Sequence, residues 1–132
     1  MSPRLMLDTD TVSFALRGQG RVVARLLEQS PSDLCMSALT LAELRFGAEA
    51  KRSRKLHRLI DTFAESVPSV PFDAEAARRF GSVAASLSRA GTPIGVVDTL
   101  IAAQALALGL TLVSNDTRHF KRVSGLKLEN WA

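Results

Sequence analysis

The chain has 132 residues, of which 46% are hydrophobic and 23% charged, a balance typical of a folded globular domain rather than a disordered segment. At this length we predict one domain, residues 1–132, with room for a sizeable core. The single cysteine, Cys35, excludes an internal disulfide and a cysteine-based zinc site. No apolar run has the length of a membrane span or a signal peptide, so we expect a cytoplasmic protein.

Strand-like and helix-like patterns alternate along the chain. In the first half we expect a strand at 4–7, helices at 11–16 and 22–29, a strand at 34–36, a helix at 39–50 and another helix around Leu56 to Phe63. In the second half we expect an edge strand at 67–70, helices at 74–90 and 96–108, a strand at 110–113, a turn at 117–120 and a strand at 126–128. This alternation predicts an α/β fold in which helices cover both faces of a parallel sheet.

The clearest helix lies between Pro93 and Gly109, which act as start and stop signals around an apolar repeat of three to four residues. Asp98 falls in its first turn, next to side chains of core type. An ionised group in that position needs a cap, a counter-ion or a metal. Attraction to the positive end of the helix is an equally good explanation when Asp98 is considered alone.

Three more acids border hydrophobic segments. Asp8 and Asp116 each follow a predicted strand, and Glu43 interrupts an apolar helix. The carboxyl ends of parallel strands share one edge of a sheet, so we expect these acids and Asp98 to converge. Clustered carboxylates repel each other unless a cation lies among them, and ligands that are all oxygen select Mg²⁺ or Mn²⁺. Such a site suits metal-assisted phosphodiester hydrolysis.

Hydroxyl groups lie beside these acids in the sequence. Thr9, Ser37 and Ser114 could orient the carboxylates or metal-associated water, although helix capping is the simpler role for Ser37. We expect the two histidines, His57 and His119, on the surface. Acid–base chemistry would then fall to the metal.

The net charge is +4. If four acids share one cleft, the rest of the surface is more positive than this total indicates, and such a surface favours a polyanionic partner. The run KRSRKLHR at 51–58 is either a solvated helix start or a contact for nucleic acid or a partner. Lys121 and Arg122 would place positive charge near Asp116. The candidates for RNA or partner contact are Arg45, Lys51, Arg52, Arg54, Lys55 and Arg118.

Four segments together resemble the PIN-domain ribonucleases, and more narrowly the VapC toxins of bacterial VapBC toxin–antitoxin pairs. They are MLDTD at 6–10, TLAELRFGA at 40–48, PIGVVDTLIAA at 93–103 and LVSNDTRHF at 112–120. The resemblance runs the whole length of the chain in the family's order. Asp10 departs from the pattern, because this position is usually Asn in the family.

The resemblance implies a three-layer α/β/α PIN-domain fold with a central, mostly parallel sheet of four to five strands. It also implies a site-specific endoribonuclease that depends on Mg²⁺ or Mn²⁺ and inhibits translation, with Asp8, Glu43 and Asp98 as an acidic triad and Asp116 as a fourth acid. The implied substrate is structured RNA, leaning to the anticodon region of the initiator tRNA. The implied partner is a VapB-type antitoxin. The resemblance also implies that the toxin forms a homodimer, which joins the antitoxin in a hetero-oligomer, and that no membrane is involved.

Two alternatives remain open. A non-toxin PIN-type RNA-processing nuclease would lack a neighbouring antitoxin gene. A receiver-like phospho-acceptor that binds Mg²⁺ would need an acceptor Asp ending a central strand and a Lys ending a later one, whereas Asp98 opens a helix and no Lys follows Val113 at the matching place. A purely structural role would leave the four acids unexplained.

Overall fold

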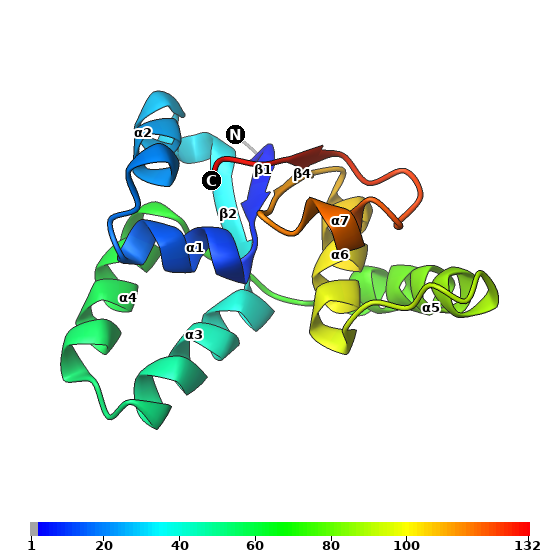
Figure 1. The fold of residues 1–132 in the computed structure, drawn as a ribbon, viewed down its shortest axis with the longest axis horizontal. Helices are drawn as coiled ribbons and strands as arrows, with labels where there is room; N and C mark the ends of the chain where they lie inside the picture. Colours follow the sequence, from blue (N-terminus) through cyan, green and yellow to red (C-terminus); the bar gives the residue numbers. More distant parts are fainter. Residues whose placement is uncertain (1–2) are drawn as a thin grey trace.

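The computed structural model of the protein describes residues 3–132, and its helices and strands form three layers (Figure 1). The first half contains β1 (Leu5–Leu7), α1 (Thr9–Leu16), α2 (Gly20–Glu28), the short turn η1 (Pro31–Asp33), β2 (Leu34–Ser37), α3 (Ala38–Ala50) and α4 (Arg54–Ser66). The second half contains β3 (Ser69–Val70), α5 (Ala74–Arg89), α6 (Val96–Leu108), β4 (Thr111–Val113), α7 (Thr117–Phe120) and β5 (Leu128–Glu129). The predicted α/β alternation is confirmed.

The five strands form one sheet in the order β3-β2-β1-β4-β5. Every neighbouring pair is parallel, so the sheet is wholly rather than mostly parallel. In the register, Leu5 of β1 lies between Leu34 of β2 and Thr111 of β4. Strands β2 and β3 lie on one side of β1, and β4 and β5, which come later in the chain, lie on the other side. Sheets of this kind bind ligands beyond the carboxyl ends of the strands at the point where the order reverses, here between β1 and β4.

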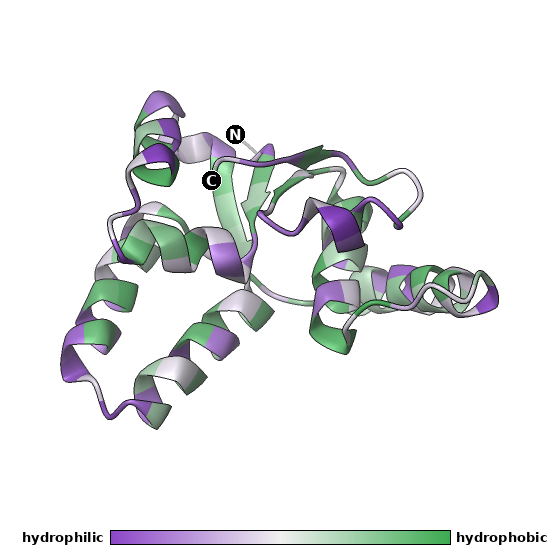
Figure 2. Cartoon of the chain, viewed as in Figure 1, coloured by the Kyte–Doolittle hydropathy of each residue, from purple (hydrophilic) through white to green (hydrophobic). Residues whose placement is uncertain are grey.

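Side chains of alternate residues along the strands enter two separate cores. Leu5, Leu7 and Met36 pack with residues of α1 to α4, whereas Met6 and Leu112 pack with residues of α5 to α7. Both faces of the sheet are therefore covered, which is why the strands read as continuous apolar runs rather than as alternating ones. Figure 2 shows the central strands in the hydrophobic colour.

The helix ends follow the signals in the sequence. The Ser37 side chain accepts a hydrogen bond from the N–H of Leu39 at 3.0 Å and caps α3. Gly95 is the N-cap of α6, and Gly109 closes that helix with a left-handed φ of 68°. Although α6 is strongly apolar, neither it nor another helix of the described residues has the length and apolar character needed to cross a membrane.

Several boundaries differ from the prediction by one to three residues. The last strand begins at Leu128, two residues later than predicted. Its bounds are set by its pairing with β4, which starts at Leu128, and not by the apolar run in the sequence. Helix α1 begins at Thr9, two residues earlier than predicted, because Asp8 caps it.

Trp131 is buried in the core on the α1–α4 side of the sheet. Burial raises the pKa of the Cys35 thiol to about 11, which keeps it protonated and unreactive.

Candidate active site

Asp8 lies at the carboxyl end of the central strand and starts the next helix. Its Oδ1 accepts a hydrogen bond from the N–H of Thr11 at 2.9 Å, and the residue is only 4% exposed. Burial raises the pKa of Asp8 to about 6, although hydrogen bonds from Ser114 and Thr11 act in the opposite direction. The nearby charge of Asp10 raises the pKa further. Asp8 is therefore a carboxylate whose charge is costly in the absence of a cation.

Asp116 follows β4 and is the N-cap of α7. Its Oδ1 accepts from the backbone N–H of His119 at 3.2 Å, and its Oδ2 lies 2.6 Å from the ring Nδ1 of the same histidine. Burial raises the pKa of Asp116, but the hydrogen bonds and charge of His119, together with the charge of Arg118, outweigh it and lower the pKa overall. This carboxylate is held ionised by groups on its own short helix.

Asp98 lies in the first turn of α6, half-buried, as the helix signals predicted. Burial is the largest cause that raises its pKa, followed by the negative charges of Asp116, Glu43 and Asp10. A Cβ built on Gly95 would lie 3.9 Å from Asp98 Oδ2, so the carboxylate extends back over the start of its helix. The repulsion indicates that the acids of four helices face one region.

Glu43 extends from α3 on the exposed side of this region. The hydroxyl of Thr9 donates a hydrogen bond to Glu43 Oε1, and the Thr40 hydroxyl lies 3.3 Å from that of Thr9. Thr9 belongs to α1, so this bond links two helices and restricts where the Glu43 carboxylate can point. Thr9 thus lies where a supporting residue was predicted.

Of the other two predicted hydroxyl residues, one contacts the acids and the other does not. The buried Ser114 accepts a hydrogen bond from the N–H of Asp116 at 2.9 Å and also lowers the pKa of Asp8 through a side-chain hydrogen bond. Ser114 therefore joins the two acids that end adjacent strands. Ser37 instead caps α3, the simpler role that the sequence had offered.

The structure brings the predicted acids to one edge of the sheet, and it adds Asp10 and His119. Asp10 is exposed in the first turn of α1, and its charge raises the pKa of both Asp8 and Asp98. Within residues 3–132, no three His, Cys, Asp or Glu side chains are arranged closely enough to hold a metal ion as they stand. The acids interact through their charges, and their role in catalysis stays a prediction.

His119 was expected on the surface, where its side chain is partly exposed, and it also contacts the site. Its side chain is 46% exposed, and its ring Nδ1 lies 2.6 Å from Asp116 Oδ2. The signal that could have identified it is the spacing, because a residue three positions after a helix N-cap faces the capping side chain.

Arg45 has an intramolecular role that the sequence did not reveal. Its guanidinium forms an ion pair with Asp61 and contacts both Nδ1 and the carbonyl oxygen of His57, at 3.0 and 3.2 Å. His57 in turn lies 2.6 Å from Glu49 through Nε2. These bonds fasten α3 to α4, so His57 is not a free surface side chain and Arg45 is not a free basic arm.

The other predicted basic contacts are exposed. They are Lys51, Arg52, Arg54, Lys55 and Arg118. Lys51 lies with Thr9 and Glu43 in one hollow between α1, α3 and α4. Arg118 is on α7, beside Asp116. Positive charge therefore lies on two sides of the acidic region.

Comparison with known proteins identifies the class to which this fold and acidic edge belong. The PIN domain matches residues 5–126. The protein named tRNA(fMet)-specific endonuclease VapC from Shigella flexneri is 35% identical to this chain, over 98% of both proteins. The protein of the same name from Salmonella typhimurium is 33% identical over 97% of this chain and 98% of its own length.

Solved structures agree with the sequence relatives. The DNA-bound VapBC of Salmonella typhimurium contains a chain with a TM-score of 0.89 and 34% identity, covering 98% of this chain and 99% of that one. VapBC2 of Rickettsia felis, bound to a DNA fragment from its promoter, gives a TM-score of 0.87 and 31% identity, covering 97% and 98%. The chain belongs to the PIN-domain family, in its VapC ribonuclease branch.

Proposed function

We propose that this chain is the toxin of a toxin–antitoxin pair, acting as a divalent-metal-dependent endoribonuclease on structured RNA. The observation that carries the proposal is the gathering of Asp8, Glu43, Asp98 and Asp116 at the β1–β4 edge. Burial raises the pKa of Asp98 there, and the charges of Asp116 and Glu43 raise it further. Membership of the VapC branch supports the same reaction class.

The donor set fits a hard divalent cation. Its four acids offer only carboxylate oxygens, the ligands that Mg²⁺ and Mn²⁺ prefer. Desolvation and repulsion raise the pKa of Asp8 and of Asp98, and a bound cation would relieve both. We assign Asp8, Glu43, Asp98 and Asp116 as the residues that would hold it. When bound, the cation supplies positive charge beside the scissile phosphate and lowers the pKa of a water molecule.

The neighbouring residues hold these acids in place before substrate arrives. Thr9 fixes Glu43 through its hydroxyl, Ser114 joins Asp8 to Asp116, and His119 holds both oxygens of Asp116. Groups that orient metal-binding side chains in this way affect metal affinity and activity strongly. The chain thus contributes a pre-oriented set of oxygen donors.

The exposed basic residues would hold the RNA against repulsion from the acids. Arg118 lies beside Asp116, and Lys51 shares a hollow with Glu43. Phosphate contacts of this kind provide affinity without reading sequence. We propose that Arg118 and the exposed residues at 51–55 contact the RNA backbone or a partner.

The proposed substrate is tRNA, with cleavage in the anticodon region of the initiator tRNA. Two relatives carry the name tRNA(fMet)-specific endonuclease, which is the support for this choice. Cutting an initiator tRNA would inhibit translation at its first step.

The proposed partner is a VapB-type antitoxin, bound by a homodimer of this chain. Several similar structures are VapBC complexes, and this supports a hetero-oligomer of the same kind. An antitoxin arginine that reached the acids could substitute for the charge of the metal, since guanidinium–carboxylate pairs are strong.

Cleavage of cellular RNA tests the proposed function directly. Purified protein is incubated with total RNA in Mg²⁺ or in EDTA, beside Asp98→Asn and the control Glu65→Gln, an exposed acid on α4. We expect discrete fragments with wild type and Glu65→Gln in Mg²⁺, and none with EDTA or Asp98→Asn. Sequencing the fragment ends identifies the substrate. Cleavage by Asp98→Asn at the wild-type rate would overturn the site.

A further inference from the structure

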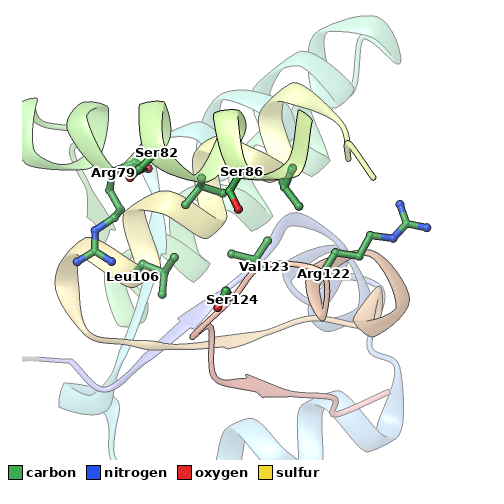
Figure 3. Close-up of a pocket in the computed structure, with 9 residues that line it drawn as sticks. Arg79, Ser82, Ser86, Leu106, Arg122, Val123 and Ser124 are labelled. Atoms are coloured by element: carbon green, nitrogen blue, oxygen red, sulfur yellow. Dashed lines mark hydrogen bonds between the residues drawn. The ribbon is translucent and has the colours of Figure 1, made fainter. Parts of the chain in front are cut away.

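A polar cavity lies outside the acidic region, between α5 and the segment that follows α7 (Figure 3). Its volume is about 180 Å³. The polar side chains that line it are Arg79, Ser82 and Ser86 from α5, and Arg122 and Ser124 from the opposite segment. Arg79 and Arg122 stand at its two ends, while apolar side chains, Leu106 and Val123 among them, lie between.

The charges around this cavity favour an anion. Two arginines line it, and its lining includes no acidic side chain of the described residues. Arg78, the neighbour of Arg79, is paired with Glu75, whereas Arg79 takes no part in the ion pairs found within residues 3–132. Ser82 is already committed, because its hydroxyl donates to the Arg79 carbonyl oxygen at 3.1 Å. The hydroxyls of Ser86 and Ser124 have no such bond among the described residues.

One end of the cavity adjoins the acidic edge. Arg122 Nη1 donates to the carbonyl oxygen of Pro93 at 3.3 Å, and Pro93 lies two residues before the N-cap of the helix that carries Asp98. Arg79 lies at the other end, seven positions before Ser86 and about 10 Å along the helix axis, toward the start of α5 and not toward the end that leads to Pro93. The cavity therefore continues from the acidic edge along α5.

We propose that this cavity binds a backbone phosphate of the RNA, away from the bond that is cut at the acidic edge; the assignment rests on the proposed function. A strand that crosses a group of carboxylates needs positive anchors beyond them. Guanidinium groups bind phosphate oxygens in a bidentate manner, and the hydroxyls of Ser86 and Ser124 add further donors to the lining of the cavity. Because such contacts do not read bases, the anchor strengthens binding to any RNA long enough to reach it.

Two adjacent arginines provide a matched test. Arg79→Gln and Arg78→Gln remove the same charge from neighbouring positions on α5, but only the first lines the cavity. Binding to bulk tRNA and to poly(U) is measured at several salt concentrations with the full chain in the Asp98→Asn background. We expect Arg79→Gln to weaken binding to both RNAs about tenfold and to lower the salt slope by about one. Arg79→Lys should restore most of the slope.

The outcomes separate the two proposals. If Arg79→Gln binds both RNAs as Arg78→Gln does, with the same slope, the cavity is not an RNA anchor although the proposed function stands. If the wild-type protein cuts no RNA in Mg²⁺, the proposed function fails and the cavity assignment with it. Equal melting temperatures of the two variants would show that a loss of binding by Arg79→Gln is not a loss of folding.

Discussion

His119 holds Asp116 through two hydrogen bonds, one from its backbone N–H to Oδ1 and one between its ring Nδ1 and Oδ2. Both oxygens of the fourth acid are therefore oriented by a single residue three positions later. The contact also lowers the pKa of Asp116. His119 is accordingly a positioning residue, and the structure predicts how its loss would affect metal binding.

His119→Ala should lower the apparent Mg²⁺ affinity in cleavage assays by about tenfold or more, in the range typical of residues that orient metal ligands. The measurement is cleavage rate against Mg²⁺ concentration. Lys121→Ala, an exposed change at the end of the same helix, is the control. Partial recovery in His119→Asn, which keeps a side-chain donor, would support positioning, and an unchanged Mg²⁺ dependence in His119→Ala would contradict it.

The stability of the metal-free protein should fall as pH rises from about 4 to about 6. Burial raises the pKa of Asp8 from 3.8 to about 6, so the folded state binds a proton that the unfolded state has already lost. A shift of that size corresponds to roughly 3 kcal/mol. The lowered pKa of Asp116 acts with the opposite sign, but at pH values below this window. Denaturant unfolding in EDTA at pH 4.5 and 7 measures the difference.

Asp8→Asn provides the control for that measurement. Asparagine caps helices as well as aspartate does, so α1 should keep its start while the titrating group is gone. The stability difference between pH 4.5 and 7 should shrink in this variant. A difference as large as that of wild type would mean that another group is responsible.

Mg²⁺ should stabilise the wild-type protein against heat. At a concentration one hundred times its Kd, a ligand adds about 2.7 kcal/mol, which raises Tm by roughly 10 °C in a chain of this size. In Asp98→Asn the metal-free protein should melt higher than wild type, because a repelled carboxylate is gone, and Mg²⁺ should add little. Thermal scans of both proteins with EDTA and with Mg²⁺ check this; equal Mg²⁺ shifts would remove Asp98 from the metal site.

Arg45 and Asp61 should be coupled in stability by about 0.2 to 1 kcal/mol. Their side chains are 36% and 61% exposed, and exposed ion pairs are worth little. A double-mutant cycle with Arg45→Met and Asp61→Asn, measured by denaturant unfolding, isolates this value. Zero coupling would show that the pair does not fasten α3 to α4.

Sequence patterns were sufficient for the elements that the core defines. β1 and β4 are apolar runs that end in polar residues, and α6 has its apolar repeat with Gly109 at the end. Because parallel strands share a carboxyl edge, the same patterns predicted that Asp8 and Asp116 would lie together. The convergence of the four acids follows from these patterns, whereas their roles as a triad and a fourth acid are what the family resemblance implies.

What the sequence did not reveal depends on tertiary contacts. Arg45 meets His57 only because the chain reverses at 51–53, where Arg52 has a φ of 50°, and no local repeat encodes that pairing. The start of the last strand was misplaced because a two-residue edge strand has too few positions to show a period. The cavity along α5 was also invisible, since its two sides are far apart in the chain.

The strand order has a consequence for the timing of synthesis. β1, which precedes Asp8, is made long before its neighbour β4, which precedes Asp116. The pairing of distant segments is slow and must await both of them. The acidic edge therefore cannot assemble until β4 has been made, about a hundred residues after β1.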